Sequence, residues 1–237
     1  MGDLSAVLFD IDDTLFSTTE FAARARRNAV RAMVQAGVRH PEEDVYRELK
    51  EVIAEFSSNY EHHYDKLLMR LPRTAVDGLN RALVVAAGVV AYHDTKFEEL
   101  EPFDDVPPLL RALRESGLIT GIVTHGWTTK QAEKLVRLQL TSLLSPNAIF
   151  ISDQVGISKP NPKLYQTALR ELMLRPDQVM YVGDNLKNDV APPKSLGMRT
   201  AWAKRAAHPD QDPQAIVPDH VVDDFDQLGK ILREDYG

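Results

Sequence analysis

Two aspartates at the end of an apolar segment are the strongest indication of chemistry in this sequence. Residues 5–9 are rich in strand-forming side chains and run directly into Asp10, Asp12, Asp13 and Thr14. If a strand covers residues 5–12, Asp10 and Asp12 share one face at its carboxyl end, where open α/β sheets bind ligands. Close carboxylates require a proton or a cation, and Mg²⁺ prefers such oxygen ligands. The alternative is a strand that ends in an acidic turn, because aspartate is common in turns.

Three later segments also end in polar residues after an apolar run or before a helix. Their polar residues are Thr124 with His125, Lys159, and Asp184 with Asp189. Thr124 and the backbone N–H groups after it can bind a phosphoryl oxygen, and Lys159 adds a positive charge at the start of a helix. The carboxyl ends of parallel strands meet at one edge of a sheet, so we expect acids for a cation beside a hydroxyl and a lysine for an anion.

Each of these residues also has an ordinary structural explanation. A threonine such as Thr124 often belongs to a turn, a lysine such as Lys159 is usually a solvated charge, and Gly183-Asp184 can cap a helix. The order of the motifs and their common position at strand ends favour a functional site over four coincidences.

The elements that would position these residues alternate between strands and helices. Short apolar runs predict strands at residues 5–12, 118–124, 148–152, 178–182, 200–203 and 220–223. Helical periodicity predicts helices at residues 106–116, 128–140, 162–174, 192–196 and 225–233. This alternation predicts an α/β fold with a parallel sheet covered on both faces.

Between the first two motifs the pattern is only helical. Helices are expected at residues 18–35, 41–56, 60–71 and 77–97, joined by short connections. They predict an all-helical bundle inserted after the first strand. The predicted domains are therefore an α/β core of residues 1–16 and 100–237, and a helical insertion of residues 17–99.

The four motifs resemble those of the haloacid dehalogenase-like hydrolase superfamily over nearly the full chain. The resemblance implies a Rossmann-like, doubly wound sheet with a helical cap, and a Mg²⁺-dependent phosphatase that forms an aspartyl-phosphate. It makes Asp10 the nucleophile and Asp12 the general acid/base, with Thr124 and Lys159 holding the phosphoryl group. It gives as metal ligands the Asp10 carboxylate, the backbone carbonyl of Asp12, and Asp184, with Asp189 binding the metal or its waters.

These roles are consistent with the physical requirements of phosphoryl transfer, which needs positioning and charge stabilisation. Asp12 must be protonated to assist the leaving group and ionised to activate water, so its environment must differ from that of Asp10. The sequence also departs from the family pattern. His125 stands where asparagine is frequent; it is a candidate substrate-binding residue facing the leaving group, with a purely structural role as the alternative. Asp13 replaces a frequent glycine and is expected in a turn. Pro192-Pro193 is expected to shift the start of a helix.

The superfamily also contains dehalogenases, mutases and phosphonatases. Dehalogenases typically carry an aromatic residue in place of Asp12, which argues against that chemistry. A phosphomutase stays open, and so does a non-catalytic binding or regulatory domain of the same fold, although the complete motifs disfavour the latter.

Substrate choice is expected to lie in the helical insertion. The sequence is similar to archaeal helical-cap phosphatases that act on glyceraldehyde 3-phosphate, which implies a small phosphorylated metabolite. The polar candidates for selecting the leaving group are Arg24, Arg27, Asn59, His62, His63 and Arg70. The alternative for each of them is a solvated helix face.

Composition excludes several classes of partner. The net charge of −7 argues against broad binding to nucleic acid, which requires a basic face. The chain has no cysteine and shows no secretory leader, so we expect a cytoplasmic protein. The most apolar window, residues 83–92, is too short to span a bilayer, and no membrane partner is expected. Nothing in the sequence indicates the oligomeric state.

Overall fold

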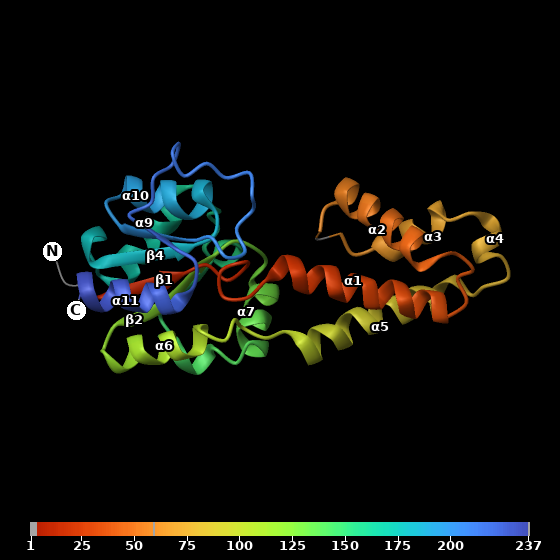
Figure 1. The fold of residues 1–237 in the computed structure, drawn as a ribbon, viewed down its shortest axis with the longest axis horizontal. Coiled ribbons are helices and arrows are strands. Elements are labelled where there is room, and N and C mark those ends of the chain that lie inside the picture. Colours follow the sequence, from red (N-terminus) through yellow and green to blue (C-terminus); the bar gives the residue numbers. More distant parts are fainter. Residues whose placement is uncertain (1–3, 59, 237) are drawn as a thin grey trace. The chain divides into compact units, whose positions relative to one another are not determined.

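The computed structural model describes residues 4–58 and 60–236. The chain divides into two compact units, and Figure 1 labels many of their helices and strands. The sheet unit contains the residues up to Thr18 and those from Glu101 on, and the helical unit spans Thr19–Leu100. We describe each unit by itself.

The sheet unit is built on six parallel strands in the order β3-β2-β1-β4-β5-β6. Their bounds are β1 Ala6–Phe9, β2 Ile119–Thr124, β3 Ile149–Ile151, β4 Val179–Gly183, β5 Arg199–Ala203 and β6 His220–Val222. The chain winds outward from β1 to β3 on one side and from β4 to β6 on the other, so the direction of winding reverses between β1 and β4. Ligands bind at such a switch point in open α/β sheets. The predicted α/β class, with a doubly wound parallel sheet, is confirmed.

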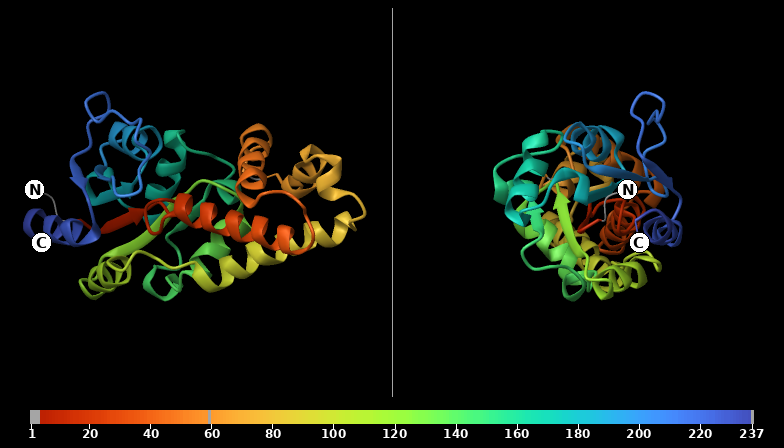
Figure 2. Two further views of the ribbon diagram at one scale, coloured as in Figure 1. Left: turned by 45° about the vertical axis from the view of Figure 1, so that its right-hand side comes forward. Right: turned by 90° about the vertical axis from the view of Figure 1, so that its left-hand side faces the viewer.

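Helices cover both faces of this sheet (Figure 1, Figure 2). Their bounds are α6 Val106–Glu115, α7 Thr128–Arg137, α8 Ser152–Val155, α9 Pro162–Leu172, α10 Ala191–Ser195 and α11 Phe225–Asp235. Successive residues of β1 face opposite sides: Leu8 packs in a cluster with Leu164 of α9, whereas the ring of Phe9 lies 5.6 Å from that of Phe225 in α11. All four residues of β1 are buried, as expected of a central parallel strand.

The helical unit contains α2 Glu42–Phe56, α3 His63–Arg70, α4 Arg73–Val76, α5 Arg81–Glu99 and nearly all of α1 Thr18–Gln35. Its core is a cluster of apolar side chains from these helices, including Met33, Leu49, Leu67 and Val84. No strand occurs among its described residues, in agreement with the sequence. The last long helix begins at Arg81 rather than at residue 77, because the Asn80 side chain accepts hydrogen bonds from Ala82 N–H and Leu83 N–H.

One local prediction was wrong near the candidate site. The first strand ends at Phe9 rather than at residue 12, because the chain leaves the sheet in a turn in which Leu15 N–H donates to Ile11 C=O. Asp13 has φ 51° in this turn, a conformation that aspartate tolerates. A π-helical turn, Leu186–Val190, directly precedes α10, and the short helix predicted from residue 192 begins at Ala191. The two prolines do lie at the start of α10.

No helix in the described ranges is both long and apolar enough to cross a membrane.

The Asp219 carboxylate stabilises the start of β5 through hydrogen bonds from Thr200. Oδ2 accepts hydrogen bonds from Thr200 N–H and Oγ1, each at 2.8 Å, and Oδ1 lies 2.8 Å from Lys194 Nζ. Burial opposes ionisation, but these hydrogen bonds and the Lys194 charge lower the pKa of Asp219 below 3.8. Asp219→Asn is expected to reduce the free energy of unfolding by about 1–2 kcal/mol at neutral pH.

Because the folded state lowers this pKa, the stabilisation is present above pH 3.8 and is lost as pH falls through the folded value. Urea unfolding of both proteins over a pH series measures the difference. Asp223→Asn is the control, since the Asp223–Lys204 pair is largely exposed and should contribute little. A difference for Asp219→Asn that does not narrow at acid pH would contradict this role.

Candidate active site

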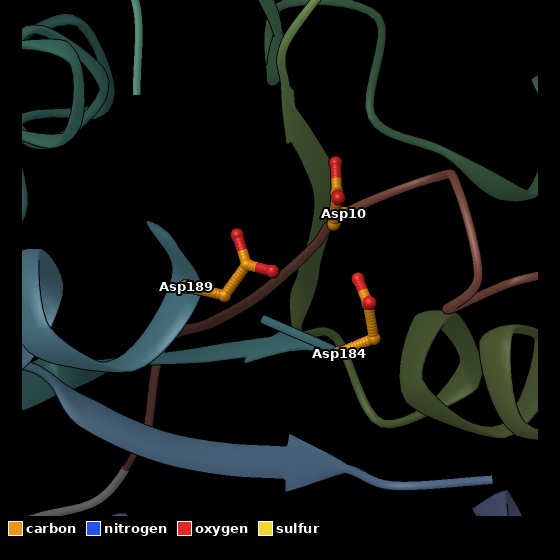
Figure 3. A group of neighbouring side chains, drawn as sticks. All are labelled: Asp10, Asp184 and Asp189. Carbon is orange, nitrogen blue, oxygen red and sulfur yellow. The ribbon is translucent and has the colours of Figure 1, made fainter. Parts of the chain in front are cut away.

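Three carboxylates converge at the carboxyl edge of the sheet (Figure 3). Asp10 follows β1, Asp184 follows β4, and Asp189 lies in the π-helical turn. One oxygen from each lies within 4.8 Å of the others. The strand register explains the meeting of the first two, because Phe9 pairs with Val182 and the residues that follow leave adjacent strands at the same level. The sequence-based expectation that these three side chains lie together agrees with this geometry.

Glycine at position 183 makes the close approach of Asp189 possible. A Cβ at Gly183 would lie 2.5 Å from the Cβ, Cγ and Oδ2 atoms of Asp189, which is too short for any carbon contact. The turn is held by Asn185, whose N–H donates to Asp189 Oδ2 at 2.9 Å and whose side chain accepts from Lys187 N–H and Asn188 N–H. The buried Asp189 carboxylate therefore has a defined orientation.

Lys159 provides the buried positive charge of this cluster. Its Nζ lies 2.7 Å from Asp189 Oδ1 and 3.0 Å from Asp10 Oδ1, the latter an ion pair outside hydrogen-bond geometry. It also donates to the Tyr181 hydroxyl at 2.8 Å, which in turn donates to Val123 C=O at 2.5 Å. Burial alone would lower the pKa of Lys159, but the charges of Asp10 and Asp189 raise it above the ordinary value. Lys159 is therefore a fixed cation.

One lysine does not neutralise three carboxylates. Burial and the charges of Asp189, Asp10 and Asp13 raise the pKa of Asp184 to about 8. Burial also raises the pKa of Asp189 to about 6, although the Lys159 charge opposes this. Without a further cation, the group must retain protons near neutral pH. An all-oxygen donor set with excess negative charge fits a hard divalent cation such as Mg²⁺, with Asp10, Asp184 and Asp189 as the residues that would hold it.

The Asp12 carboxylate is not part of this group. Oδ1 accepts from Thr18 Oγ1 at 2.6 Å, Oδ2 accepts from Gln131 Nε2 at 3.0 Å, and Lys134 Nζ lies 2.6 and 2.7 Å from the two oxygens. Burial would raise the pKa of Asp12, but the Lys134 charge and these hydrogen bonds lower it. Asp12 and Asp10 thus have different environments, as separate acid/base and nucleophile roles require.

Thr124 and His125 lie where β2 ends. Thr124 is buried, and its Oγ1 accepts from Gln131 Nε2 at 3.1 Å. His125 is exposed, and its Nδ1 lies 2.6 Å from Ser158 Oγ, the residue before Lys159. The second and third motifs are therefore linked through a side-chain hydrogen bond.

Sequence reasoning missed the residues that hold these groups in place. Gln131 and Lys134 contact Asp12 from α7, while Trp202 Nε1 and Gln211 Nε2 both donate to Asp184 C=O, at 2.7 and 2.9 Å. No local signal marks them: a buried glutamine or lysine in an amphipathic helix has the same pattern as a solvated one.

The polar candidates in the helical unit mostly pair with acids of the same unit. Arg24 pairs with Glu99 at 2.6 Å, Arg27 with Glu43 at 2.6 Å, and Arg70 with both Glu48 and Glu55. His62 lies 3.5 Å from Asp65, and His63 Nε2 is hydrogen-bonded to Ser57 C=O at 2.7 Å. Asn59 lies outside the described residues. These contacts agree with the alternative of helix-surface residues and provide no evidence for a shared substrate-binding role.

Comparison with known proteins shows the family to which this chain belongs. Residues 7–203 match the family model described as haloacid dehalogenase-like hydrolase, and the chain belongs to that family. A glyceraldehyde 3-phosphate phosphatase of Methanopyrus kandleri is 43% identical over 235 residues, covering 98% of each chain. One of Pyrococcus furiosus is 36% identical over 238 residues, covering 100% of this chain and 96% of the relative. Within the family, this protein is a phosphatase.

Solved structures support the fold. A HAD phosphatase of Thermococcus onnurineus has a TM-score of 0.68 at 22% identity, with 97% of this chain and 98% of that one covered. A putative beta-phosphoglucomutase of Thermotoga maritima has a TM-score of 0.73 at 19% identity, with coverage of 98% and 99%. At such identities the likeness concerns the fold alone.

The carboxylate cluster predicts that metal binding stabilises the protein. Mg²⁺ at about 100 times its dissociation constant should add about 2.7 kcal/mol to the free energy of unfolding. For a chain of this size, the melting temperature should rise by about 5–10 °C. Asp184→Asn should remove most of this rise because it removes one ligand, whereas the exposed control Asp223→Asn should keep it. Thermal melting with and without a chelator measures it; a shift unchanged in Asp184→Asn would place the metal elsewhere.

Proposed function

We propose that this protein hydrolyses a small phosphate monoester through an aspartyl-phosphate on Asp10, with Mg²⁺ as cofactor. The observation that carries the proposal is the convergence of Asp10, Asp184 and Asp189 on the buried Lys159 at the carboxyl edge of the sheet. The site thus combines a carboxylate nucleophile, a set of cation ligands and a fixed positive charge, which phosphoryl transfer requires.

In the first step, an oxygen of Asp10 attacks phosphorus, and the bond from phosphorus to the ester oxygen breaks. The leaving alcohol takes a proton, and the phosphoryl group stays on Asp10 as an acyl phosphate. Thr124 and Lys159 are proposed to bind its oxygens, since a hydroxyl and a buried ammonium lie at the same sheet edge. When bound, Mg²⁺ would offset the charge shared by the carboxylates and the phosphoryl group.

In the second step, water attacks phosphorus and releases inorganic phosphate and the free Asp10 carboxylate. Asp12 is proposed to take the proton from this water and to return it to the next leaving group. The contacts of Asp12 favour the ionised form, which is the form that activates water.

The substrate is proposed to be glyceraldehyde 3-phosphate or a close analogue. Five relatives carrying that name are 31–43% identical, and four of them match over 97% or more of this chain. We propose that the helical unit serves as the cap that selects the leaving group. Hydrolysis rates on a panel containing glyceraldehyde 3-phosphate, glycerol phosphate, phosphoserine and pyrimidine 5′-nucleotides test this. Higher kcat/KM for a nucleotide than for the triose phosphate would reject the substrate.

Replacing the proposed nucleophile should abolish turnover. Asp10→Asn keeps the size of the side chain but provides a far poorer nucleophile, so kcat should fall by about a thousandfold or more. Asp13→Asn is the matched control, because it removes the neighbouring carboxylate in a turn that asparagine also tolerates. The control should stay within about tenfold of the wild type. Comparable activity of Asp10→Asn and the wild type, at equal melting temperature, would remove Asp10 from the mechanism.

A further inference from the structure

The inward face of α7 carries two polar side chains that the proposed mechanism does not use. Gln131 and Lys134 are three residues apart and therefore lie on the same side of the helix. Gln131 is buried, and the Lys134 side chain is 20% exposed. Both contact Asp12, although they lie more than a hundred residues away in the sequence.

We propose that Gln131 and Lys134 are positioning residues that set the orientation of the Asp12 carboxylate relative to Thr124. The inference rests on the proposed function, because it assigns the group that holds the proposed acid/base. It concerns how this chain orients Asp12 and is independent of which ester is the substrate.

The hydrogen bonds to Asp12 leave its carboxylate little rotational freedom. Lys134 Nζ contacts both oxygens, at 2.6 and 2.7 Å, and Thr18 and Gln131 each donate to a different oxygen. A rotation about the bond that carries the carboxylate breaks at least one charge-assisted hydrogen bond. Lys134 is the one charged group in this set, and its loss would leave only two neutral donors.

Gln131 connects the acid/base to the phosphoryl-binding residue. Its Nε2 lies 3.0 Å from Asp12 Oδ2, 3.1 Å from Thr124 Oγ1 and 2.5 Å from His125 C=O, so its two N–H groups serve three acceptors and one of them is shared. All three neighbours can accept, which assigns the NH₂ group to this side of the amide. One buried amide therefore fixes the spacing between Asp12 and Thr124. Proton transfer depends steeply on such spacing.

Lys134 differs from Lys159 in its partners. Lys159 contacts Asp10 and Asp189, whereas Lys134 contacts Asp12. Loss of Lys134 should therefore affect proton transfer while it leaves metal binding and phosphoryl binding intact. A lysine that merely neutralises a buried acid would instead affect stability, with no dependence on the leaving group.

The test compares Lys134→Met with Lys130→Met, its matched control. Lys130 lies one turn earlier in α7, and its Nζ lies 4.2 Å from the centre of the Trp127 ring. Rates are measured with 4-nitrophenyl phosphate, whose leaving group needs no proton, and with an alkyl phosphate. For Lys134→Met we expect kcat to fall about 10–100-fold with the alkyl ester and less with the aryl ester, with KM within about threefold. Lys134→Arg should recover part of the rate, and Lys130→Met should behave as the wild type.

Two outcomes would overturn the inference. The first is that Lys134→Met keeps the wild-type kcat on both esters. The second is that it loses activity equally on both esters and also shows a smaller Mg²⁺-induced rise in melting temperature. Lys134→Gln, which keeps a donor, is measured in the same way if the methionine variant does not fold, and the same two outcomes decide. Failure of the proposed function has a different signature. It would appear as wild-type protein that hydrolyses neither ester, or as an active Asp10→Asn, whatever the Lys134 variants do.

Discussion

Repulsion between carboxylates is the constraint on which the rest of this structure depends. Asp10, Asp184 and Asp189 approach within 4.8 Å at a sheet edge, and Lys159 forms ion pairs with two of them, Asp10 and Asp189. Such an arrangement is unfavourable in a protein selected for stability alone, since close like charges raise the cost of ionisation. The arrangement persists because the surrounding fold holds each carboxylate in place. Such electrostatic repulsion is typical of sites that bind a cation and an anionic substrate.

Residues of the sheet strands hold the carboxylate cluster in place. Tyr181 in β4 accepts a hydrogen bond from Lys159 and donates one to Val123 in β2, so it connects the lysine to the two strands that flank β1. Gly183 leaves room for Asp189, and Trp202 in β5 holds the backbone carbonyl of Asp184. Three strands of the sheet therefore fix the cluster. Loops alone would give looser geometry, and phosphoryl transfer depends on positioning within fractions of an ångström.

The carboxylate cluster could be predicted because the carboxyl ends of the strands can be identified from the sequence. An apolar run that stops at Asp10, or at Gly183 before Asp184, identifies a carboxyl end, and parallel topology brings such ends together. The shared strand face of Asp10 and Asp12 was predicted wrongly, since β1 ends at Phe9 and local periodicity does not reveal where a chain leaves a sheet. Gln131 and Lys134 could not be predicted, because contacts between α7 and Asp12 depend on how the helix packs. The π-helical turn at Leu186 likewise depends on the contacts of Asp189.

A crystal structure of the protein grown with Mg²⁺ and beryllium fluoride, a mimic of an acyl phosphate, tests the central claim most directly. The account predicts a beryllium–oxygen bond to Asp10, with the fluorides near Thr124 and Lys159. It also predicts Mg²⁺ bound by the Asp10 and Asp184 carboxylates, with Asp189 contacting the metal or its waters. Beryllium fluoride on another residue, or Mg²⁺ bound away from Asp184 while Asp10 carries no adduct, would contradict it.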